Sequence, residues 1–199
     1  MISSLMIITA TVVYAGVHSL LAYSGAKLWI RQRYGPGIEQ WYRLAYNVFA
    51  VLSGLPILVL LYLLPDQPLY QIPFPWILLT ALGQLVGVVI IVVGILQTDV
   101  WHFIGLRQII QSDNHQKPEM VSRGLYSWVR HPLYTGGLLL IWLVPTMTLN
   151  LLTVFVLLTI YLVLGAKLEE KRLVEEFGDE YRAYQARVPM LLPVPRRKQ

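Results

Sequence analysis

Two groups of polar side chains flank a long apolar block of this chain. Arg130, His131 and Tyr134 lie where the block begins, and Glu169 and Glu170 follow it. Such residues can hold a zwitterionic, purine-bearing ligand, because carboxylates bind an ammonium, a guanidinium binds a carboxylate and aromatic rings stack on a base. The sequence therefore predicts a ligand clamp made of an arginine side and a glutamate side, close to a membrane surface.

The same residues also have a plainer interpretation as anchors at the membrane interface. Arg123 and Arg130 would then be ordinary interfacial cations, and Tyr126, Trp128 and Tyr134 would belong to an aromatic belt. Anchoring does not account for the glutamate pair, because a carboxylate where a helix leaves the bilayer is costly unless it meets a cation. The combination of both groups favours the clamp.

The composition places these groups in a membrane protein. Hydrophobic residues make up 56% of the 199 residues and charged residues 14%, whereas a soluble domain carries about 25% charged residues. The mean hydropathy is +0.56. The chain has no cysteine, which excludes disulfides, thiolate metal sites and a catalytic cysteine. We expect its net charge of +5 to face lipid headgroups, so the expected partner is the bilayer and not a nucleic acid.

The apolar blocks predict an all-α integral membrane protein with about five transmembrane helices, folded as one membrane domain over residues 1–199. A helix needs about 20 apolar residues to cross the hydrocarbon. The block from Leu133 to Ala166 is too long for one helix and contains the break "VPTMTLN", so it predicts a short hairpin. The expected spans are residues 2–23, 44–64, 74–96, 133–148 and 150–166, followed by a cytoplasmic amphipathic helix at about 167–187.

The amphipathic helix is predicted from apolar residues spaced by three and four. The stripe consists of Val174, Phe177, Tyr181, Tyr184 and Val188. Glu170 lies four residues before the first of them, which places it on the same helix face. Glu169 lies about 100° away around the helix. We therefore expect Glu170 to point toward whatever the stripe covers.

The basic residues predict the orientation of the chain. All 16 lysines and arginines fall in segments after the first, third and fifth expected spans, so five spans place them on one side. The opposite side, represented by residues 64–74 and 144–150, has none. The positive-inside rule then predicts a multi-pass membrane protein with the N-terminus outside and the C-terminus in the cytoplasm.

The order of these motifs resembles a known family. The stretch "RGLYSWVRHPLYTGG", then a hydrophobic hairpin, then "EEKRLVEEFGDEYRAY" and "VP", covers residues 123–189. It resembles the catalytic half of membrane methyltransferases of the isoprenylcysteine carboxyl methyltransferase and phospholipid N-methyltransferase type. Three earlier motifs, "GVHSLLA", "YRLAYN" and "FIGLRQ", are similar to the NnrU-like branch, which also resembles methanethiol S-methyltransferases and 15-cis-zeta-carotene isomerases.

The resemblance implies S-adenosylmethionine as the cofactor and methyl transfer as the activity. The residues that would bind the cofactor are Gly124, Leu125, Tyr126, His131, Tyr134, Glu169 and Glu170. Arg130 would neutralise charge on cofactor or substrate and is, with Glu170, the expected catalytic pair; no metal is expected. Displacement at a sulfonium depends mainly on alignment and exclusion of water. The expected acceptor is a small or lipophilic molecule, with a thiol or a carboxylate favoured.

One departure from the family pattern narrows the acceptor. The phospholipid enzymes carry a Gly-x-Gly element in an earlier span, and this chain has no match for it. Gly83 and Gly87 are the nearest small residues in the third expected span. The departure argues against a phospholipid headgroup as the acceptor.

Two other functions stay open from the sequence. The carotene isomerases use two membrane histidines as haem ligands, and the matching residues here are His18 and His131. A haem b between them would make the protein a redox-gated isomerase or sensor. A non-enzymatic membrane accessory protein is the third class. Asp99 and His102 have the spacing of a chelating pair, although two ligands do not make a metal site.

Overall fold

The computed structural model describes residues 2–35, 38–98 and 120–193. The motif "FIGLRQ" and the pair Asp99 and His102 lie outside the described residues. The chain divides into two compact units, of which the first holds residues 1–67 and the beginning of the last long helix. The second holds the remaining described residues, including both predicted polar groups. The single membrane domain expected over residues 1–199 stays a prediction.

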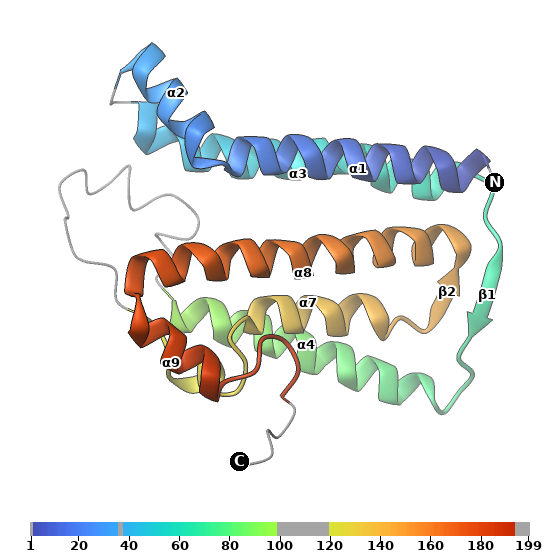
Figure 1. Cartoon of the computed structure of the whole chain (residues 1–199). Helices are drawn as coiled ribbons and strands as arrows, with labels where there is room; N and C mark the ends of the chain where they lie inside the picture. Colours follow the sequence, from blue (N-terminus) through green and yellow to red (C-terminus); the bar gives the residue numbers. More distant parts are fainter. Residues whose placement is uncertain (1, 36–37, 99–119, 194–199) are drawn as a thin grey trace. The chain divides into compact units, whose positions relative to one another are not determined.

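The first unit is a helical hairpin with a short helix at its turn (Figure 1). Its helices are α1 (Ile2–Ala22), α2 (Ser24–Tyr34) and α3 (Glu39–Leu63). The hydroxyl of Tyr42 donates to the carbonyl of Leu21 over 2.5 Å, which holds α3 against the end of α1. Helix α2 was not predicted, although its leucine, lysine, glutamine and arginines favour a helix. It ends at Gly35, whose φ is 89°.

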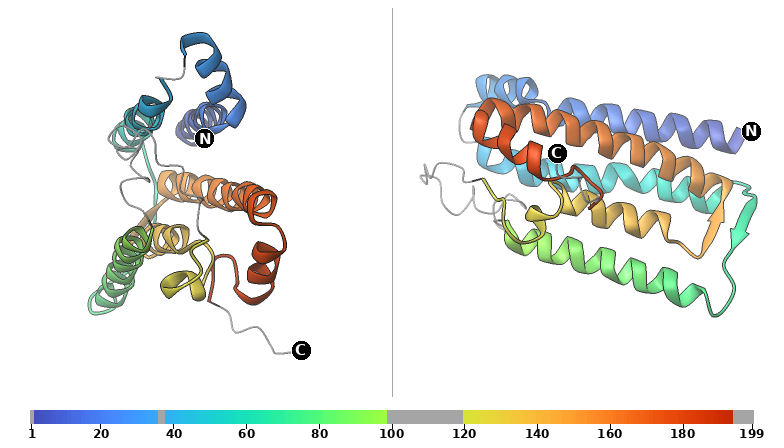
Figure 2. Two further views of the ribbon diagram at one scale, coloured as in Figure 1. Left: turned by 90° about the vertical axis from the view of Figure 1, so that its left-hand side faces the viewer. Right: turned by 60° about the horizontal axis from the view of Figure 1, so that its bottom comes forward.

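The second unit contains three apolar helices, of which α7 lies between α4 and the C-terminal half of α8 (Figures 1 and 2). Its elements in chain order are β1 (Pro68–Gln71), α4 (Ile77–Gln97), the 3-10 helix η2 (Gly124–Ser127), α7 (Pro132–Trp142), β2 (Thr146–Thr148), α8 (Leu149–Phe177) and α9 (Asp179–Arg187). The strands β1 and β2 pair in a two-stranded sheet. The fold is therefore mostly helical, as predicted, but not purely α.

Two glycines allow α4 and α7 to approach until their backbones touch. A Cβ atom on Gly136 would lie 2.7 Å from the carbonyl oxygen of Gly87, and one on Gly87 would lie 2.9 Å from the carbonyl oxygen of Gly136. Close backbone packing of this kind is a common way for helices to associate in membranes, where burial from water gives little driving force. The glycine pair fixes α7 on α4.

The helix predicted over the fourth span, residues 133–148, is shorter than expected, because α7 ends at Trp142. Pro145 has no N–H to donate and disfavours helix at the residue before it, so the chain continues in extended form. The ending leaves helix carbonyls without helical partners, and the side chain of Gln84 donates to the carbonyl of Leu140 over 3.0 Å. This bond satisfies a polar group that apolar surroundings would leave unpaired.

The last predicted span and the amphipathic helix predicted to leave it are joined in one helix. Residues 167–177 contain good helix formers and no glycine or proline, so α8 continues through residue 166 to Phe177. The helix stops where Gly178 adopts a φ of 58°, and α9 begins at the next residue. The predicted stripe does pack as one cluster, with Tyr181, Tyr184 and Val188 buried, but it is divided between two helices.

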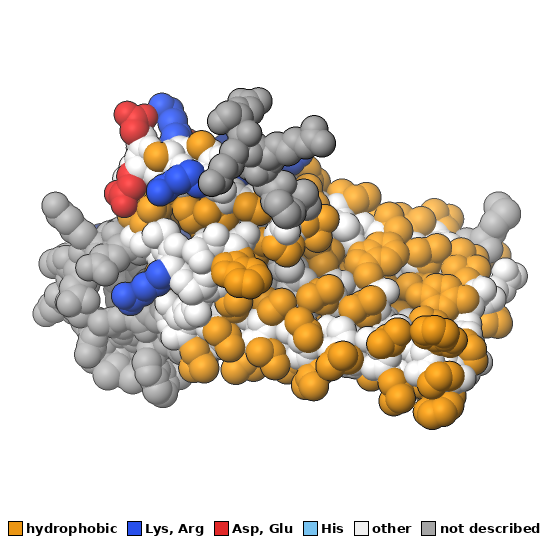
Figure 3. Space-filling model, turned by 90° about the horizontal axis from the view of Figure 1, so that it is seen from below, with side chains coloured by type: hydrophobic (Ala, Val, Ile, Leu, Met, Phe, Trp, Pro, Cys, Tyr) orange, Lys and Arg blue, Asp and Glu red, His pale blue; other side chains and the backbone are white. Residues whose placement is uncertain are grey.

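Four helices of the described residues are long and apolar enough to cross a membrane. They are α1, Leu44–Leu63 within α3, α4 and α8. With 11 residues, α7 is shorter. Exposed hydrophobic side chains cover the face seen in Figure 3, and the charged side chains gather at one end. The chain is a multi-pass membrane protein.

Candidate active site

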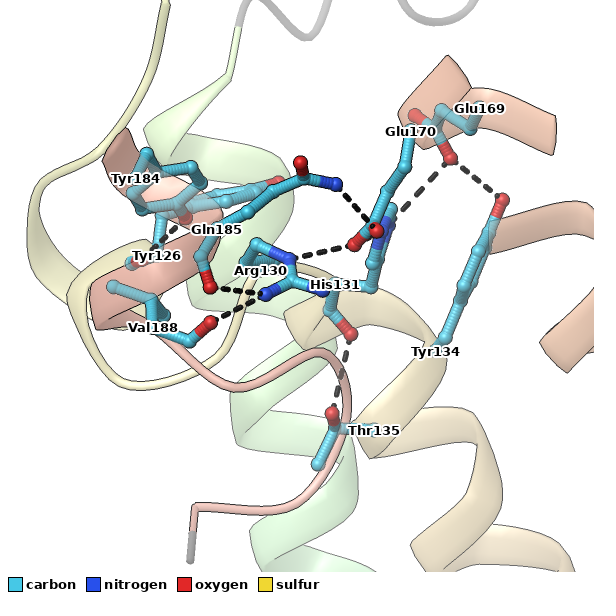
Figure 4. Close-up of polar contacts among 10 residues, drawn as sticks. All are labelled: Tyr126, Arg130, His131, Tyr134, Thr135, Glu169, Glu170, Tyr184, Gln185 and Val188. Atoms are coloured by element: carbon cyan, nitrogen blue, oxygen red, sulfur yellow. Dashed lines mark hydrogen bonds and ion pairs between the residues drawn. The ribbon is translucent and has the colours of Figure 1, made fainter. Parts of the chain in front are cut away.

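The two predicted polar groups meet at one end of the second unit (Figure 4). Arg130 and His131 directly precede α7, whose first residue is Pro132, as predicted from the fixed φ of proline in a first helical turn. Glu169 and Glu170 face them from α8. Residues far apart in the sequence are thus joined by the return of α8 along α7.

Glu170 is the centre of the site. Its Oε1 accepts a hydrogen bond from Arg130 Nε over 2.6 Å and lies 3.2 Å from His131 Nε2. Its Oε2 accepts from Gln185 Nε2 over 2.8 Å. The side chain is only 10% exposed. We call Arg130, His131, Glu170 and Gln185 the Glu170 cluster; within it, both carboxylate oxygens are already occupied.

Arg130 is compensated by the protein itself. Besides Glu170, its Nη1 donates to the carbonyls of Gln185 over 3.0 Å and Val188 over 2.5 Å. These carbonyls end α9, where a helix leaves acceptors unpaired and its dipole favours a cation. The side chain is 8% exposed. The guanidinium therefore joins α7, α8 and α9 in one buried junction.

Glu169 differs from its neighbour because its side chain is 49% exposed. Its Oε2 accepts from the Tyr134 hydroxyl over 3.1 Å and lies 3.6 Å from His131 Nδ1. The rings of His131 and Tyr134 stack with their planes 6° apart and their centroids 5.3 Å apart. The expected 100° separation thus gives one buried carboxylate and one that a ligand can reach.

The turn predicted at residues 124–126 forms η2 beside these carboxylates. Gly124 has a φ of 64°, and a Cβ atom there would overlap the side chain of Gln97. The same Gln97 accepts from the Leu125 N–H through Oε1 over 2.9 Å. Glycine is therefore required at the point where η2 packs on the end of α4.

Two tyrosines keep their protons at this site. Burial, and then the negative charge of Glu169, raise the pKa of Tyr126 to about 12. Burial is also the main cause that raises the pKa of Tyr184 to about 12. The Tyr184 hydroxyl donates to the Tyr126 carbonyl over 2.5 Å. Both rings stay neutral at physiological pH, so the net charge beside Glu169 is unaffected by them.

Comparison with known proteins supports an enzymatic assignment. A family model described as "Protein of unknown function (DUF1295)" matches residues 30–188. Methanethiol S-methyltransferases from a Pseudomonas species and from Bradyrhizobium diazoefficiens are 35% and 32% identical, over 90% of this chain and 69% and 63% of their own lengths. The protein-S-isoprenylcysteine O-methyltransferase of Saccharomyces cerevisiae is 28% identical over 75% of this chain and 62% of its own. This chain is a membrane methyltransferase of the DUF1295 family.

The predicted resemblance to the membrane methyltransferase superfamily is thereby confirmed, and so is the resemblance to methanethiol S-methyltransferases. The NnrU-like branch stays a prediction. The chain spans about two thirds of the length of these curated relatives. No solved structure matches the chain.

In this membrane methyltransferase every residue predicted to bind the methyl donor lies in the second unit. Sequence reasoning missed Gln185, which bonds both Glu170 and Arg130, and Thr135, whose hydroxyl bonds the carbonyl of Leu191. Gln185 follows Tyr184 of the apolar stripe and lies four residues after Tyr181, so the turn of α9 was a usable signal. Nothing in the local sequence marks Thr135.

The two histidines of the haem alternative lie in different units. His18 Nε2 lies 2.6 Å from the Tyr46 hydroxyl, and the ring of His18 stacks on Tyr14. His131 faces carboxylates through both ring nitrogens. To ligate haem, His131 would have to give up its contact with Glu169 or Glu170. Haem binding by His18 and His131 stays a prediction.

Proposed function

We propose that this protein transfers the methyl group of S-adenosylmethionine to a small thiol at the cytoplasmic face of the membrane. The observation that carries the proposal is the adjacent glutamate pair, in which Glu170 is held by contacts with three side-chain nitrogen atoms and Glu169 is half exposed beside Tyr134. The most similar relatives reported above are named for a thiol acceptor. A carboxylate acceptor, as in the yeast relative's name, is the less favoured member of the same class.

The side chains fit the cationic part of this cofactor. Glu169 offers a reachable carboxylate to the ammonium, and Tyr126 and Tyr134 offer aromatic rings to the adenine. Arg130 is already paired with Glu170, so its proposed contribution is to keep that carboxylate in place and balance its charge. The predicted catalytic pair then acts by holding the donor site in shape.

The proposed reaction needs little acid–base chemistry from the protein. When bound, S-adenosylmethionine supplies an electrophilic methyl group on a sulfonium. The acceptor thiolate forms a sulfur–carbon bond in line as the methyl–sulfonium bond breaks, and that electron pair stays on the departing sulfur. The thiol proton goes to solvent. The protein's part is to orient the reactants and exclude water.

Replacing Glu169 with glutamine tests the donor site. We expect the affinity for S-adenosylmethionine to fall by about 10- to 100-fold, because a hydrogen bond to a charged group is worth about 1.5–3 kcal/mol. Titration calorimetry of the purified protein in detergent measures it. Glu176→Gln, an exposed glutamate on the same helix, is the matched control and should bind normally.

An absence of S-adenosylmethionine and S-adenosylhomocysteine binding to the unaltered protein would overturn the proposed function. A Soret band that disappears in His18→Ala would favour haem instead. With methanethiol as acceptor, the assay is the appearance of dimethyl sulfide, and a prenylcysteine carboxylate in parallel distinguishes the two acceptor types.

The proposed orientation has the N-terminus outside and the C-terminus in the cytoplasm. It depends on a fifth membrane crossing, made by α7 together with residues 143–148. Gly94 of α4 meets Leu133 at the start of α7, and Gly83 of α4 meets Leu143 just after its end. The extended residues end in β2, which pairs with β1, the strand that precedes α4 in the chain. This stretch therefore runs along most of α4, which supports a crossing despite the short helix.

Single cysteines test this orientation, because the chain has none of its own. We expect Gln67→Cys to react with a membrane-impermeant maleimide on intact cells, since it follows the second crossing. Arg182→Cys, in α9, should react only after permeabilisation. Labelling of Arg182→Cys on intact cells would contradict a cytoplasmic C-terminal side.

A further inference from the structure

The segment that follows α9 lies against the beginning of α7. The backbone N–H of Arg130 donates to the Pro189 carbonyl over 2.9 Å, and the N–H of His131 donates to the Met190 carbonyl over 3.1 Å. Buried backbone groups of this kind are costly to leave unpaired. The segment of residues 188–191 is thus a wall of the candidate active site, not a loose continuation of α9.

Thr135 fastens the far end of this segment. Its side-chain hydroxyl lies 2.6 Å from the carbonyl oxygen of Leu191 and 3.1 Å from that of His131. A hydroxyl has one proton to donate, and the shorter distance assigns it to Leu191. Thr135 is 8% exposed, so solvent does not readily replace the bond.

The beginning of the segment, at Val188, is held by the charged side chain of Arg130. Arg130 donates through Nη1 to the carbonyls of Gln185 and Val188 while its Nε holds Glu170. The position of the guanidinium therefore depends on where residues 188–191 lie. If the segment moves away, the guanidinium of Arg130 loses the Val188 carbonyl and the backbone N–H of Arg130 loses the Pro189 carbonyl, so its hold on Glu170 loosens.

We propose that Thr135 is a positioning residue for the methyl-donor site and acts through the 188–191 segment. Its bond to Leu191 keeps the segment docked, the docked segment keeps Arg130 on Glu170, and Glu169 is left as the carboxylate that meets the cofactor. Donor binding and docking of the segment then favour each other, since both need the same arrangement. The inference rests on the proposed use of S-adenosylmethionine.

Thr135→Val keeps the shape of the side chain and removes its donor. We expect the KM for S-adenosylmethionine to rise about tenfold, the equivalent of about 1.4 kcal/mol, with kcat changed by less than about twofold. Thr135→Ser keeps the hydroxyl and should return the KM to near its original value. Thr80→Val is the matched control, because that hydroxyl bonds a carbonyl of its own helix, that of Ile77, over 2.8 Å.

Limited trypsin digestion measures directly how often the 188–191 segment leaves α7. The bond between Arg187 and Val188 becomes cleavable when the segment leaves α7, and mass spectrometry identifies the cut. We expect S-adenosylhomocysteine to slow this cleavage in the unaltered protein, and Thr135→Val to speed it about tenfold without ligand. The first measurement needs no variant, so it stands even if Thr135→Val folds poorly.

The outcomes separate the inference from the proposed function. Cleavage that ligand does not slow, with ligand binding established by calorimetry, overturns the coupling. A KM in Thr135→Val equal to that of Thr80→Val overturns the role of Thr135. If the protein binds neither S-adenosylmethionine nor S-adenosylhomocysteine, the proposed function is wrong. Faster cleavage of Thr135→Val would still show that this residue docks the segment.

Discussion

Glu170→Gln should abolish most of the activity and also lower the stability of the folded protein. The substitution leaves the buried Arg130 guanidinium without its counter-charge and puts an amide where His131 and Gln185 meet a carboxylate. Breaking a buried ion pair from one side costs about 3–5 kcal/mol. We expect at least a hundredfold loss of kcat/KM and a clear fall in the thermal unfolding midpoint in detergent.

A double-mutant cycle separates the pair from its surroundings. Because Arg130→Met removes the stranded charge, the double variant with Glu170→Gln should be less destabilised than the sum of the two single changes. Glu176→Gln on the exposed face of α8 should leave both stability and activity intact. Full activity in Glu170→Gln would show that the Glu170 cluster is dispensable.

Gly136→Ala should be strongly destabilising, although it adds a single methyl group. The new Cβ atom would lie 2.7 Å from the Gly87 carbonyl oxygen and 2.7 Å from Ile91 Cγ1, so α7 must move off α4. Overpacking costs about 1–3 kcal/mol where side chains can shift, and a backbone oxygen cannot. We expect the upper end of this range, measured as loss of folded protein after heating in detergent.

The neighbouring glycine provides the control. A Cβ atom on Gly137 would meet nothing within 4 Å. Gly137→Ala should therefore be neutral, or should stabilise α7 by up to about 1 kcal/mol through its higher helix propensity. Equal effects of the two substitutions would mean that propensity, and not contact with α4, decides the stability of α7.

Periodicity and helix chemistry predicted the parts of the site that lie on regular elements. Pro132 begins α7 as expected, and the spacing from Glu170 to the apolar stripe placed that glutamate inward and Glu169 about 100° away around the helix. These predictions held because the spacing of residues along a helix fixes the directions of their side chains, whatever surrounds the helix. The helices end at other residues than predicted, because Gly178 and Pro145 decide where α8 and α7 stop and a composition average does not detect single residues.

The connections made across the fold could not be predicted. Thr135 lies in a helix among glycines and leucines, and the proposed role of its hydroxyl depends on a hydrogen bond to Leu191, which is distant in the sequence. Arg130 was expected to meet a ligand, and it meets the end of α9 because Gly178 turns that helix back. Such contacts depend on tertiary geometry, which local sequence does not encode by itself.

The reciprocal contact between Gly87 and Gly136 also limits how this sequence can change over generations. Each glycine is required by the carbonyl oxygen of the other, so a side chain at either position alone meets the same obstruction. A lineage can leave this arrangement only by first separating the two helices, which would disturb the proposed methyl-donor site at the start of α7. We expect the two positions to change together or not at all, while Gly137 drifts freely beside them.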